Sequence, residues 1–509
     1  MWTSLVGISG AIILGIAKAY FYFLFYIIWV LLVRVFQMSV IAYNGHPVSL
    51  RTIPLMLYTQ WLGSFVKIKA LFNLSDQKWS KGTETQSSDD SVAKIDHPLF
   101  NYMPDFLMNF SYLVFFYVML LSHEAIALPD LDVLKEKTMK PGKDWTIDAK
   151  ALGVIANDGK DDGIVISKII AEAAPKSIIL LPAGTIDLFT PIFVKKSNIT
   201  IKGVSKEKTL ILAHLKTEDK GAILVEGARL KQVGSLKRAV KYGDSVVYAK
   251  LKHDESLKWI KISEANDKKF LNDLGSIVWN REYPYLRQEI TSVSSLNKNI
   301  LYLNNALTTP FSGKNSKIHR LKMIENIHLE DFTIQQVIQG HKIYEVMGKY
   351  KNIFPSHMVD LIRYEYVVNS SVKNIKLLDA GSNPLVFENV YNCNARNLEV
   401  DGSWNKGKKG NGYVRFSRAF SSKIVDSSIK NIRHLTIQWS SANNSFTNLD
   451  MGVDINLHGG YSHDNEINDI EFKIPFFHKW KGIVLTPPNA GWAPPDGARN
   501  FAQNILGAQ

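Results

Sequence analysis

The sequence predicts a mainly β protein: a parallel β-helix in which a single chain coils into a solenoid, with a small β insertion, preceded by α-helical transmembrane segments. Three observations predict this fold. The first 33 residues are almost wholly apolar. From about residue 144 the chain changes to short β-branched runs separated by Asn, Gly, Ser and Asp. In the C-terminal half similar segments recur about every 20 to 25 residues, the length of one coil of a solenoid.

The N-terminal stretch from Leu5 to Val33 contains few polar residues besides Lys18 and small hydroxyl side chains. It is long enough to cross a bilayer core of about 30 Å, which requires about 20 helical residues, so at least one span is expected. Lys18 and Arg34 bracket a very aromatic segment. This leaves two alternatives open: two short helices, or one long tilted helix whose Lys18 extends to the interface.

Further apolar segments follow. Residues 53–74 are interrupted by two lysines and a glutamine, which indicates a helix in the interface plane, with a buried helix of a larger membrane bundle as the alternative. We therefore expect residues 1–74 to be membrane-embedded or interfacial helices. Residues 75–105 are polar and predict a cytoplasmic linker. Residues 106–127 end near Ala125-Ile126-Ala127 and predict either a second transmembrane helix or a signal-like segment with a cleavage site.

Charge is distributed unevenly along the chain. It has 60 Lys and Arg against 47 Asp and Glu, a net charge of +13, and residues 1–82 carry seven basic side chains against Asp76 alone. Positive charge beside apolar segments favours a cytoplasmic orientation and contact with anionic membrane lipid. A nucleic-acid reader would instead place a basic stripe on a folded domain, so no nucleic-acid partner is expected. The single cysteine, Cys393, excludes an intrachain disulfide and a multi-cysteine zinc site.

Residues 140–229 predict a cap followed by the first coils of the solenoid. Apolar residues between Asp161 and Ala174 fall at helical spacing, and the adjacent Asp161 and Asp162 are expected to cap that helix at its N-terminus. Three short strands should follow, at Ile178–Leu181, Ile192–Val194 and Ile199–Ile201.

The C-terminal half contains the repeat. Segments with Asn or Ser beside alternating aliphatic residues read NIHLEDFTI, SVKNIKLLDA, NARNLEVDG, SSIKNIRHLTIQ, NSFTNLDM and NEINDIEF. Stacked coils share a core of inward Ile, Leu and Val, and Asn at the bends tolerates left-handed backbone and can ladder its amide from coil to coil. We expect coils over residues 321–475 and a capping tail over 476–509. In residues 230–320 this repeat is interrupted, which predicts the small β insertion there.

Residues 144–203 contain the stretches DAKALGVIANDGKDDGIVISKIIAEAA, IILLPAGTI and TPIFVKKSNITIKGV. In order and spacing they resemble the start of the pectate-lyase-like β-helix superfamily, in its rhamnogalacturonase/epimerase-type branch. Members of that branch show paired aspartates, an amphipathic helix, a Leu-Pro-Ala-Gly turn and a strand reading S-N-I-T-I-x-G. The resemblance covers about residues 140–475, and it implies a right-handed parallel β-helix that binds or acts on polysaccharide.

Residues 20–82 contain the stretch PVSLRTIPLMLYTQWLGSFVKIKALFNLSDQKWSKG. It is similar to the C-terminal membrane tail of a processive family-2 glycosyltransferase of the mannuronan synthase type. The catalytic core of such enzymes is absent from this sequence, so synthase activity is not predicted. The resemblance implies a protein of the bacterial cytoplasmic membrane that is anchored by this segment or docks against an exopolysaccharide synthase complex. The β-helix would then lie on the outer side, periplasmic or extracellular.

An enzyme that removes the proton α to a uronate carboxylate needs a cation on that carboxylate, a base, and an acid at the leaving oxygen or the opposite face. The residues expected to carry this chemistry are Arg415, Arg433, His434, Asp454 and His458. His434 and His458 are one coil apart and could stack on one face, while Arg433 neutralises the carboxylate. Strand alternation, however, puts Arg433 and His434 on opposite faces unless the chain bends there.

The residues expected to bind substrate are Arg418, His463, Asp464, Trp404 and Trp439. The tryptophans either stack on sugars or cover the side of the solenoid. No metal ligands and no certain cofactor are predicted, and Ca²⁺ is left open. The sequence thus favours a membrane-anchored β-helix enzyme acting on an acidic exopolysaccharide, as a uronate C5-epimerase or a lyase. The alternatives are a noncatalytic polysaccharide-binding or guiding component of a synthase complex, and a glycoside hydrolase of the polygalacturonase type, which needs paired carboxylates.

Overall fold

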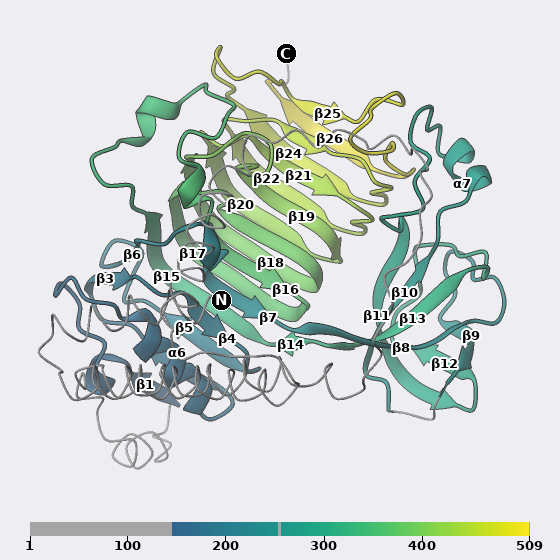
Figure 1. Ribbon diagram of the computed structural model, residues 1–509, viewed down its shortest axis with the longest axis horizontal. Helices are drawn as coiled ribbons and strands as arrows, with labels where there is room; N and C mark the ends of the chain where they lie inside the picture. The colour runs from purple at the N-terminus through teal and green to yellow at the C-terminus, as the bar shows by residue number, and fades with distance from the viewer. Residues whose placement is uncertain (1–144, 253–255, 508–509) are drawn as a thin grey trace, which may run out of the picture. The chain divides into compact units, whose positions relative to one another are not determined.

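The computed structural model describes residues 145–252 and 256–507, which all belong to the second of the chain's two compact units, Leu128–Gln509. The membrane, interfacial, linker and signal-like segments expected in residues 1–127 lie outside the described residues. Within the described ranges, no helix has the length and apolar character needed to cross a membrane. The described part is mainly β, as the sequence predicts, and it is built around one large parallel sheet (Figure 1).

This sheet has 20 strands and winds as a solenoid, because its strands pair in parallel with strands of the next coil. The coils present three faces. The first face stacks β1 (Thr146–Asp148), β2 (Ser177–Leu180), β5 (Ile199–Lys202), β15 (Ile327–Gln336), β17 (Val367–Ala380), β18 (Leu385–Ser403), β20 (Lys423–Lys430), β22 (Ser445–Met451), β24 (Glu466–Phe472) and β26 (Phe501–Leu506). The short β14 (Ile324–Glu325) leads into β15.

The long strands bend, so that the second halves of β15 to β24 form another face. This second face begins with β3 (Gly184–Leu188) and β6 (Thr209–Ala213). The third face stacks β4 (Ile192–Val194), β7 (Gly221–Glu226), β16 (Asp360–Glu365), the first part of β18, β19 (Tyr413–Phe420), β21 (His434–Gln438), β23 (Ile455–Leu457) and β25 (Ile483–Leu485).

The corner between the first and second faces is made by residues with left-handed backbone. Asp331, Asn374 and Asn397 occupy it on successive coils, with φ of 62°, 55° and 52°. Their side chains form a ladder, in which Asn374 Nδ2 donates to Asp331 Oδ1 at 2.5 Å and Asn397 Nδ2 donates to Asn374 Oδ1 at 2.9 Å. The same pairing recurs in later coils. Short Asn and Asp side chains tolerate this backbone, so the expected amide ladder at the bends is confirmed.

Inward aliphatic residues stack in register along the third face. On successive coils they are Ile223, Ile362, Leu385, Val414, Leu435 and Ile455, each 0% exposed. Burying one such side chain contributes roughly 1.5–3 kcal/mol. Because the core holds these positions in register, the outward residues between them are also aligned from coil to coil.

The helix expected between Asp161 and Ala174 is confirmed as α6 (Gly163–Glu172), whose apolar face of isoleucines is buried. Asp162 stands at the N-cap position but makes no side-chain cap bond, and its Oδ1 accepts instead from Ile155 N at 3.1 Å. Asp161 Oδ1 accepts from the first helical amide, that of Gly163, at 3.1 Å. The aspartate pair is therefore structural, although the bond to the helix is made one residue earlier than the N-cap.

Between β7 and β14 the chain leaves the solenoid and forms a closed antiparallel barrel. Its strands are β8 (Ala228–Leu236), β9 (Val246–Leu251), β10 (Trp259–Glu264), β11 (Arg287–Asn297), β12 (Ile300–Leu303) and β13 (Ser316–Lys322), and α7 (Lys268–Asp273) lies between β10 and β11. The barrel has its own apolar interior, which includes Val247, Ile260, Leu301 and Ile318.

The barrel and a second insertion flank the third face. The barrel emerges where β7, a third-face strand, ends, and Figure 1 shows it beside the ends of the third-face strands. Residues 337–359, which include the 3-10 helices η3 (Ile343–Val346) and η4 (Pro355–His357), immediately precede β16, where a third-face strand begins. The outward side of the third face is therefore bordered by one insertion at each edge.

Candidate functional site

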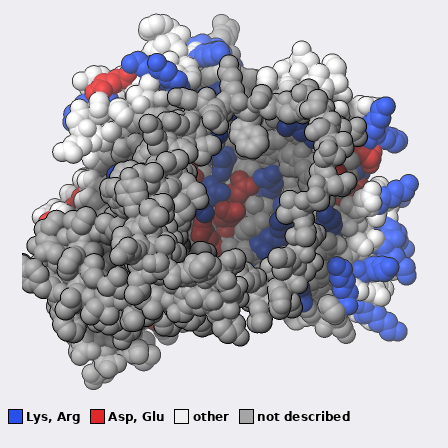
Figure 2. Space-filling model, viewed as in Figure 1, with Lys and Arg blue, Asp and Glu red and all other residues white. Residues whose placement is uncertain are grey.

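The outward side of the third face carries polar side chains stacked from coil to coil. Residues alternate along each strand, so Val414 and Leu435 lie in the core while Tyr413 and His434 point outward. We name the outward side of β16, β19, β21 and β23, with the turns at its edges, the third-face groove. Figure 2 shows basic and acidic side chains gathered at the position that β16, β18 and β19 occupy in Figure 1.

Two histidines share one carboxylate at the start of the third-face strands. His434 Nδ1 lies 2.8 Å from Oδ1 and 2.9 Å from Oδ2 of Asp454, which is its neighbour one coil later. His478 Nε2 lies 2.8 Å from the same Oδ1, and the Tyr350 hydroxyl lies 2.7 Å from His478 Nδ1. Asp454 is 0% exposed and His434 is 2% exposed. Turns at the groove edge thus enclose a chain of four hydrogen-bonded side chains.

The protonation states follow from this geometry. Burial alone would raise the pKa of Asp454, but hydrogen bonds from His434 and His478 lower it below its ordinary value, so the carboxylate is ionised. Burial lowers the pKa of His434 despite the attraction of Asp454. A neutral His434 must donate Nδ1–H to the carboxylate, which leaves the lone pair on Nε2. This is the arrangement that a general base requires.

Arg433 lies beside that lone pair. Its Nε is 3.3 Å from His434 Nε2, its Nη1 donates to the Lys406 carbonyl at 2.7 Å, and its guanidinium is 5.2 Å from the centre of the Trp480 ring. Simple strand alternation would separate Arg433 from His434. The chain bends at Asn431, whose φ is 57°, and β21 begins only at His434, so both side chains reach the same site.

His458 lies on the same outward side as His434 but is not its in-register neighbour. Leu457 pairs with Ile437, which places His458 further along the strand direction. The Tyr413 ring connects the two histidines, with its centre 5.4 Å from His434 and 6.1 Å from His458. Burial lowers the pKa of His458 to about 4, so its imidazole is neutral. The structure therefore brings the two histidines into one site without stacking one on the other.

Arginines and glutamates occupy the middle of the groove. Glu388 accepts from Arg418 at 2.7 Å and lies 3.5 Å from Arg415. On the preceding coil, Arg363 lies 3.1 Å from Glu365, which is the in-register neighbour of Glu388. Burial alone would raise the pKa of Glu388, but the nearby arginines lower it overall. Arg415 and Arg418 are thus held by a buried, ionised carboxylate.

Three polar atoms on neighbouring coils of this groove are buried without a hydrogen-bond partner. They are Arg415 Nε, the hydroxyl oxygen of Thr436 and His458 Nδ1. Arg415 and Thr436 are in-register neighbours on β19 and β21. Buried polar groups are nearly always satisfied, by protein, water or ligand. Their grouping on one side of one sheet marks a polar part of the groove floor.

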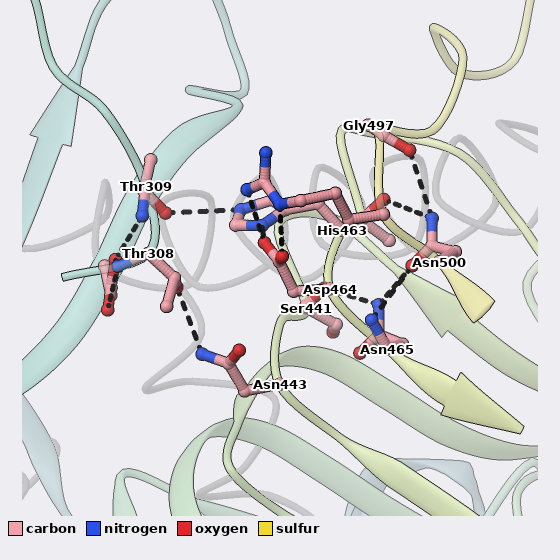
Figure 3. Close-up of polar contacts among 12 residues, drawn as sticks. Thr308, Thr309, Ser441, Asn443, His463, Asp464, Asn465, Gly497 and Asn500 are labelled. Atoms are coloured by element: carbon pink, nitrogen blue, oxygen red, sulfur yellow. Dashed lines mark hydrogen bonds and ion pairs between the residues drawn. The ribbon is translucent and has the colours of Figure 1, made fainter. Parts of the chain in front are cut away.

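His463 and Asp464 lie at another position, shown in Figure 3. His463 Nδ1 lies 2.6 Å from Asp464 Oδ2, and its Nε2 lies 3.3 Å from the hydroxyl oxygen of Thr309 in the barrel. Asp464 Oδ2 also accepts a hydrogen bond from Arg499 Nη2 at 2.7 Å. Asn443 donates to the Thr308 hydroxyl at 3.1 Å. These contacts join the barrel to the later coils, and the structure does not bring His463 or Asp464 together with His434.

The two tryptophans expected to bind sugar pack against other aromatic rings of the protein. Trp404 is 1% exposed, and its ring centre lies 5.4 Å from that of Phe354. Trp439 is partly buried, with its ring 5.9 Å from that of Trp279 in the barrel loop. Both therefore follow the alternative in which they cover the solenoid. The tryptophan that contacts a catalytic candidate is Trp480, whose ring centre is 4.3 Å from that of His434.

Four groove residues were not predicted: Tyr350, Lys406, Tyr413 and His478. Tyr413 precedes His434 by one coil, so counting the repeat would have found it. Tyr350 lies in the insertion 337–359, where no local sequence pattern indicates a site residue. Lys406 is 2% exposed, and burial lowers its pKa to about 8. A buried lysine within 5.9 Å of the Tyr350 ring adds positive potential to the same edge of the groove.

The sequence leaves Ca²⁺ open as a cofactor. In the part of the chain that the structure describes, no group of three or more His, Cys, Asp or Glu is arranged to hold a metal ion. The carboxylate of Asp454 is already engaged in hydrogen bonds from His434 and His478.

Comparisons with known proteins separate the N-terminal region from the β part. No protein-family profile matches the chain. The chain is 35% identical over 81 residues to the glycosyltransferase Alg8 of Azotobacter vinelandii, which is 16% of each protein. It is 28% identical over 89 residues to Alg8 of Pseudomonas syringae pv. tomato, 18% of each. The resemblance of the N-terminal region to a glycosyltransferase is thereby confirmed, and the chain spans less than a fifth of the length of these relatives.

Several solved structures share some similarity with the chain. The A-module of the mannuronan C-5 epimerase AlgE4 of Azotobacter vinelandii is 11% identical with a TM-score of 0.32, over 64% of this chain and 67% of that one. The ORF18 protein of Geobacillus virus E2 is 11% identical with a TM-score of 0.38, over 76% and 65%. The Gp54 tailspike of Acinetobacter baumannii bacteriophage AP22, solved with a capsular saccharide, is 12% identical with a TM-score of 0.33, over 65% and 57%. Similarity at this level says nothing about activity.

Proposed function

We propose that this protein is a membrane-anchored, right-handed β-helix enzyme that acts on an acidic exopolysaccharide of the bacterial cell envelope, as a uronate C5-epimerase or a polysaccharide lyase. One observation carries the proposal. Burial keeps His434 neutral, and Asp454 accepts its Nδ1–H, which leaves the Nε2 lone pair beside the Arg433 guanidinium, in a groove where three other buried polar atoms lack partners.

The proposed chemistry begins with the uronate carboxylate on Arg433. Its guanidinium now donates weakly to His434 Nε2, at 3.3 Å, and a carboxylate would draw that donor away and free the lone pair. His434 Nε2 then takes the C5 proton. The electron pair of the broken C5–H bond moves into the carboxylate, which the guanidinium stabilises.

The second half of the reaction distinguishes the two activities. In a lyase the electron pair forms a C4=C5 double bond while the C4–O bond breaks, and an acid protonates the leaving oxygen. In an epimerase an acid returns a proton to C5 from the opposite face. Tyr413 is the proposed acid of the lyase, because its ring contacts both His434 and His458 on the same side of the sheet as the base.

The proposed cellular setting rests on the N-terminal region. Its apolar segments and its similarity to a glycosyltransferase support anchorage in the bacterial cytoplasmic membrane, in contact with lipid and beside an exopolysaccharide synthase complex. In this proposal the β-helix lies on the outer side, where it meets the emerging polymer.

The test uses the full-length protein in detergent with a panel of uronate polymers. Ultraviolet absorbance of unsaturated products reports a lyase, and solvent deuterium entering C5 reports an epimerase. His434→Gln should abolish whichever signal appears, whereas His341→Gln, at an exposed histidine outside the groove, should retain it. The absence of both signals on every polymer of the panel would reject lyase and epimerase chemistry.

Two alternatives remain in different classes. A noncatalytic binding or guiding component would bind uronate polymer without either signal, but the neutral histidine beside an arginine favours the enzyme. A glycoside hydrolase is favoured by the in-register pair Glu365 and Glu388. Because nearby arginines lower the pKa of Glu388, it could act only as base or nucleophile. New reducing ends without unsaturation would identify that activity.

A further inference from the structure

The barrel presents a stacked pair of aromatic rings, one exposed and one partly buried, that the proposed chemistry does not use. Tyr283 is 56% exposed, and its ring stacks on that of Tyr285 with centres 4.6 Å apart and planes inclined by 29°. The Tyr285 hydroxyl donates to that of Tyr283 at 2.9 Å. Lys317 on β13 places its ammonium group 5.2 Å from the Tyr285 ring and 6.0 Å from the Tyr283 ring. We name these three side chains the tyrosine platform.

The loop that carries the platform is held by many hydrogen bonds. Asn266 Nδ2 donates to the carbonyls of Arg281, Glu282 and Pro284 at 3.1, 3.0 and 2.9 Å, and its Oδ1 accepts from Leu286 N at 3.0 Å. One amide side chain thereby closes the whole turn around the tyrosines. A preorganised surface loses little conformational entropy when a ligand binds.

A second set of contacts fixes the base of the loop. Arg287 Nη1 lies 2.7 Å from Glu264 Oε1, a pair whose side chains are 9% and 0% exposed. Gln288 Nε2 donates to the Tyr285 carbonyl at 2.6 Å and to the hydroxyl of Ser440 in the solenoid at 3.1 Å. The platform is thus fixed both to the barrel and to the solenoid that forms the groove.

The platform is continuous with the third-face groove through one side of the barrel. Lys317 and His319 are two residues apart on β13, so they share a side of that strand, and His319 pairs with Lys261 on β10. Lys261 Nζ donates to Asn389 Oδ1 at 2.8 Å. Asn389 directly follows Glu388, which is part of the groove. Side-chain contacts along one side of the barrel therefore connect the platform to the residues beside Glu388, and burial lowers the pKa of His319 to about 4 and that of Lys261 well below its usual range.

We propose that the tyrosine platform is a second saccharide-binding site, which holds a distal part of the acidic glycan whose reacting part lies in the third-face groove. A ring face binds the C–H face of a pyranose, and an ammonium group beside it binds a uronate carboxylate. Hydrogen bonding to Tyr285 raises the pKa of Lys317, which keeps it cationic. This inference rests on the proposed function, because it takes the ligand of the groove to be an acidic glycan.

The test measures affinity of full-length protein in detergent for oligouronates of two and about twelve sugars, by calorimetry. The variants are Tyr283→Ala with Tyr285→Ala, Lys317→Gln, and, as a matched control, Tyr302→Ala at a 37% exposed tyrosine elsewhere on the barrel. The double variant should weaken binding of the long oligomer about tenfold, or about 1.4 kcal/mol. Binding of the disaccharide, and the control, should remain unchanged.

Several outcomes would overturn the inference, and they are distinguishable from failure of the proposed function. Equal loss for both lengths, no loss for either, or equal binding of a neutral glucan would reject the platform as a distal acidic-glycan site. A double variant that changes oligomeric mass in solution instead of glycan affinity would assign the tyrosines to a protein contact. If the unaltered protein binds no uronate polymer, both proposals fall. If it binds and turns over uronate while the platform variants match it, the inference alone falls.

Discussion

His434 and Asp454 are neighbours on adjacent coils, joined from Nδ1 to both carboxylate oxygens at 2.8 and 2.9 Å. This relationship decides which imidazole nitrogen carries the proton, because an ionised carboxylate can only accept. The lone pair is therefore on Nε2, which the Arg433 Nε–H faces at 3.3 Å.

Asp454→Asn should reduce turnover by about a hundredfold to ten-thousandfold, because an amide at this position can donate to His434 Nδ1 and turn the imidazole to the wrong tautomer. The uronate affinity should change little. The measurement is kcat on the polymer identified in the panel, with Asp450→Asn, at a half-exposed aspartate on β22, as the control. A kcat within threefold of the unaltered protein would contradict the role of His434 as base.

The acid limb of the activity profile should lie below pH 6.5, the ordinary pKa of histidine. Burial lowers the pKa of His434, and it lowers that of His458 to about 4, so both imidazoles stay neutral in mildly acidic solution. The measurement is kcat from pH 4 to 8. Activity that is already halved at pH 7 on the acid side would show that a group with a raised pKa controls the reaction.

Glu289→Gln should stabilise the protein above pH 7. Burial raises the pKa of Glu289 from 4.5 to about 7, although the amides of Thr308 and Thr309 donate to its carboxylate. A carboxyl with a raised folded pKa contributes stability that is fully present below pH 4.5 and is lost as pH rises through 7. Thermal unfolding at pH 5 and pH 8 checks this. The variant should gain only at pH 8, and an equal gain at both would contradict the assignment.

Asn397→Ala should destabilise the solenoid by about 1 kcal/mol, because alanine resists the left-handed backbone at φ 52° and loses the bond to Asn374. Asn397→Gly, which accepts that backbone, should recover part of the loss. Denaturant unfolding of the two variants separates the backbone contribution from the ladder. If glycine were as destabilising as alanine, left-handed backbone would not explain the choice of asparagine at this corner.

Much of the candidate site could be predicted because its residues carry distinctive chemistry in a repeating segment. Arg433, His434, Asp454 and His458 meet in the groove, and Arg415 lies on the same outward side. The expected pairing of His434 with His458 assumed a constant coil length. His434 and Asp454 are in fact 20 positions apart, so His434 meets the aspartate instead.

The partners contributed by insertions could not be predicted. Tyr350 reaches His478 across 128 positions of the chain, and Lys261 of the barrel reaches Asn389 across the same separation. No periodicity connects such positions, since each depends on how an insertion folds back on the solenoid. The same reason applies to His463, which was expected to bind substrate and which instead contacts Thr309 of the barrel.

By itself the sequence determined the mainly β character, the cap helix α6 and the asparagine corners, because alternation, helical spacing and left-handed backbone are local preferences of a few residues. Only the tertiary structure decided which outward side chains meet. Their proximity depends on coil length, on core stacking that sets the register, and on where the barrel and residues 337–359 lie against the third face. Coil length, register and the placement of the insertions each result from many contacts between residues far apart in the sequence. No short stretch of sequence therefore determines them.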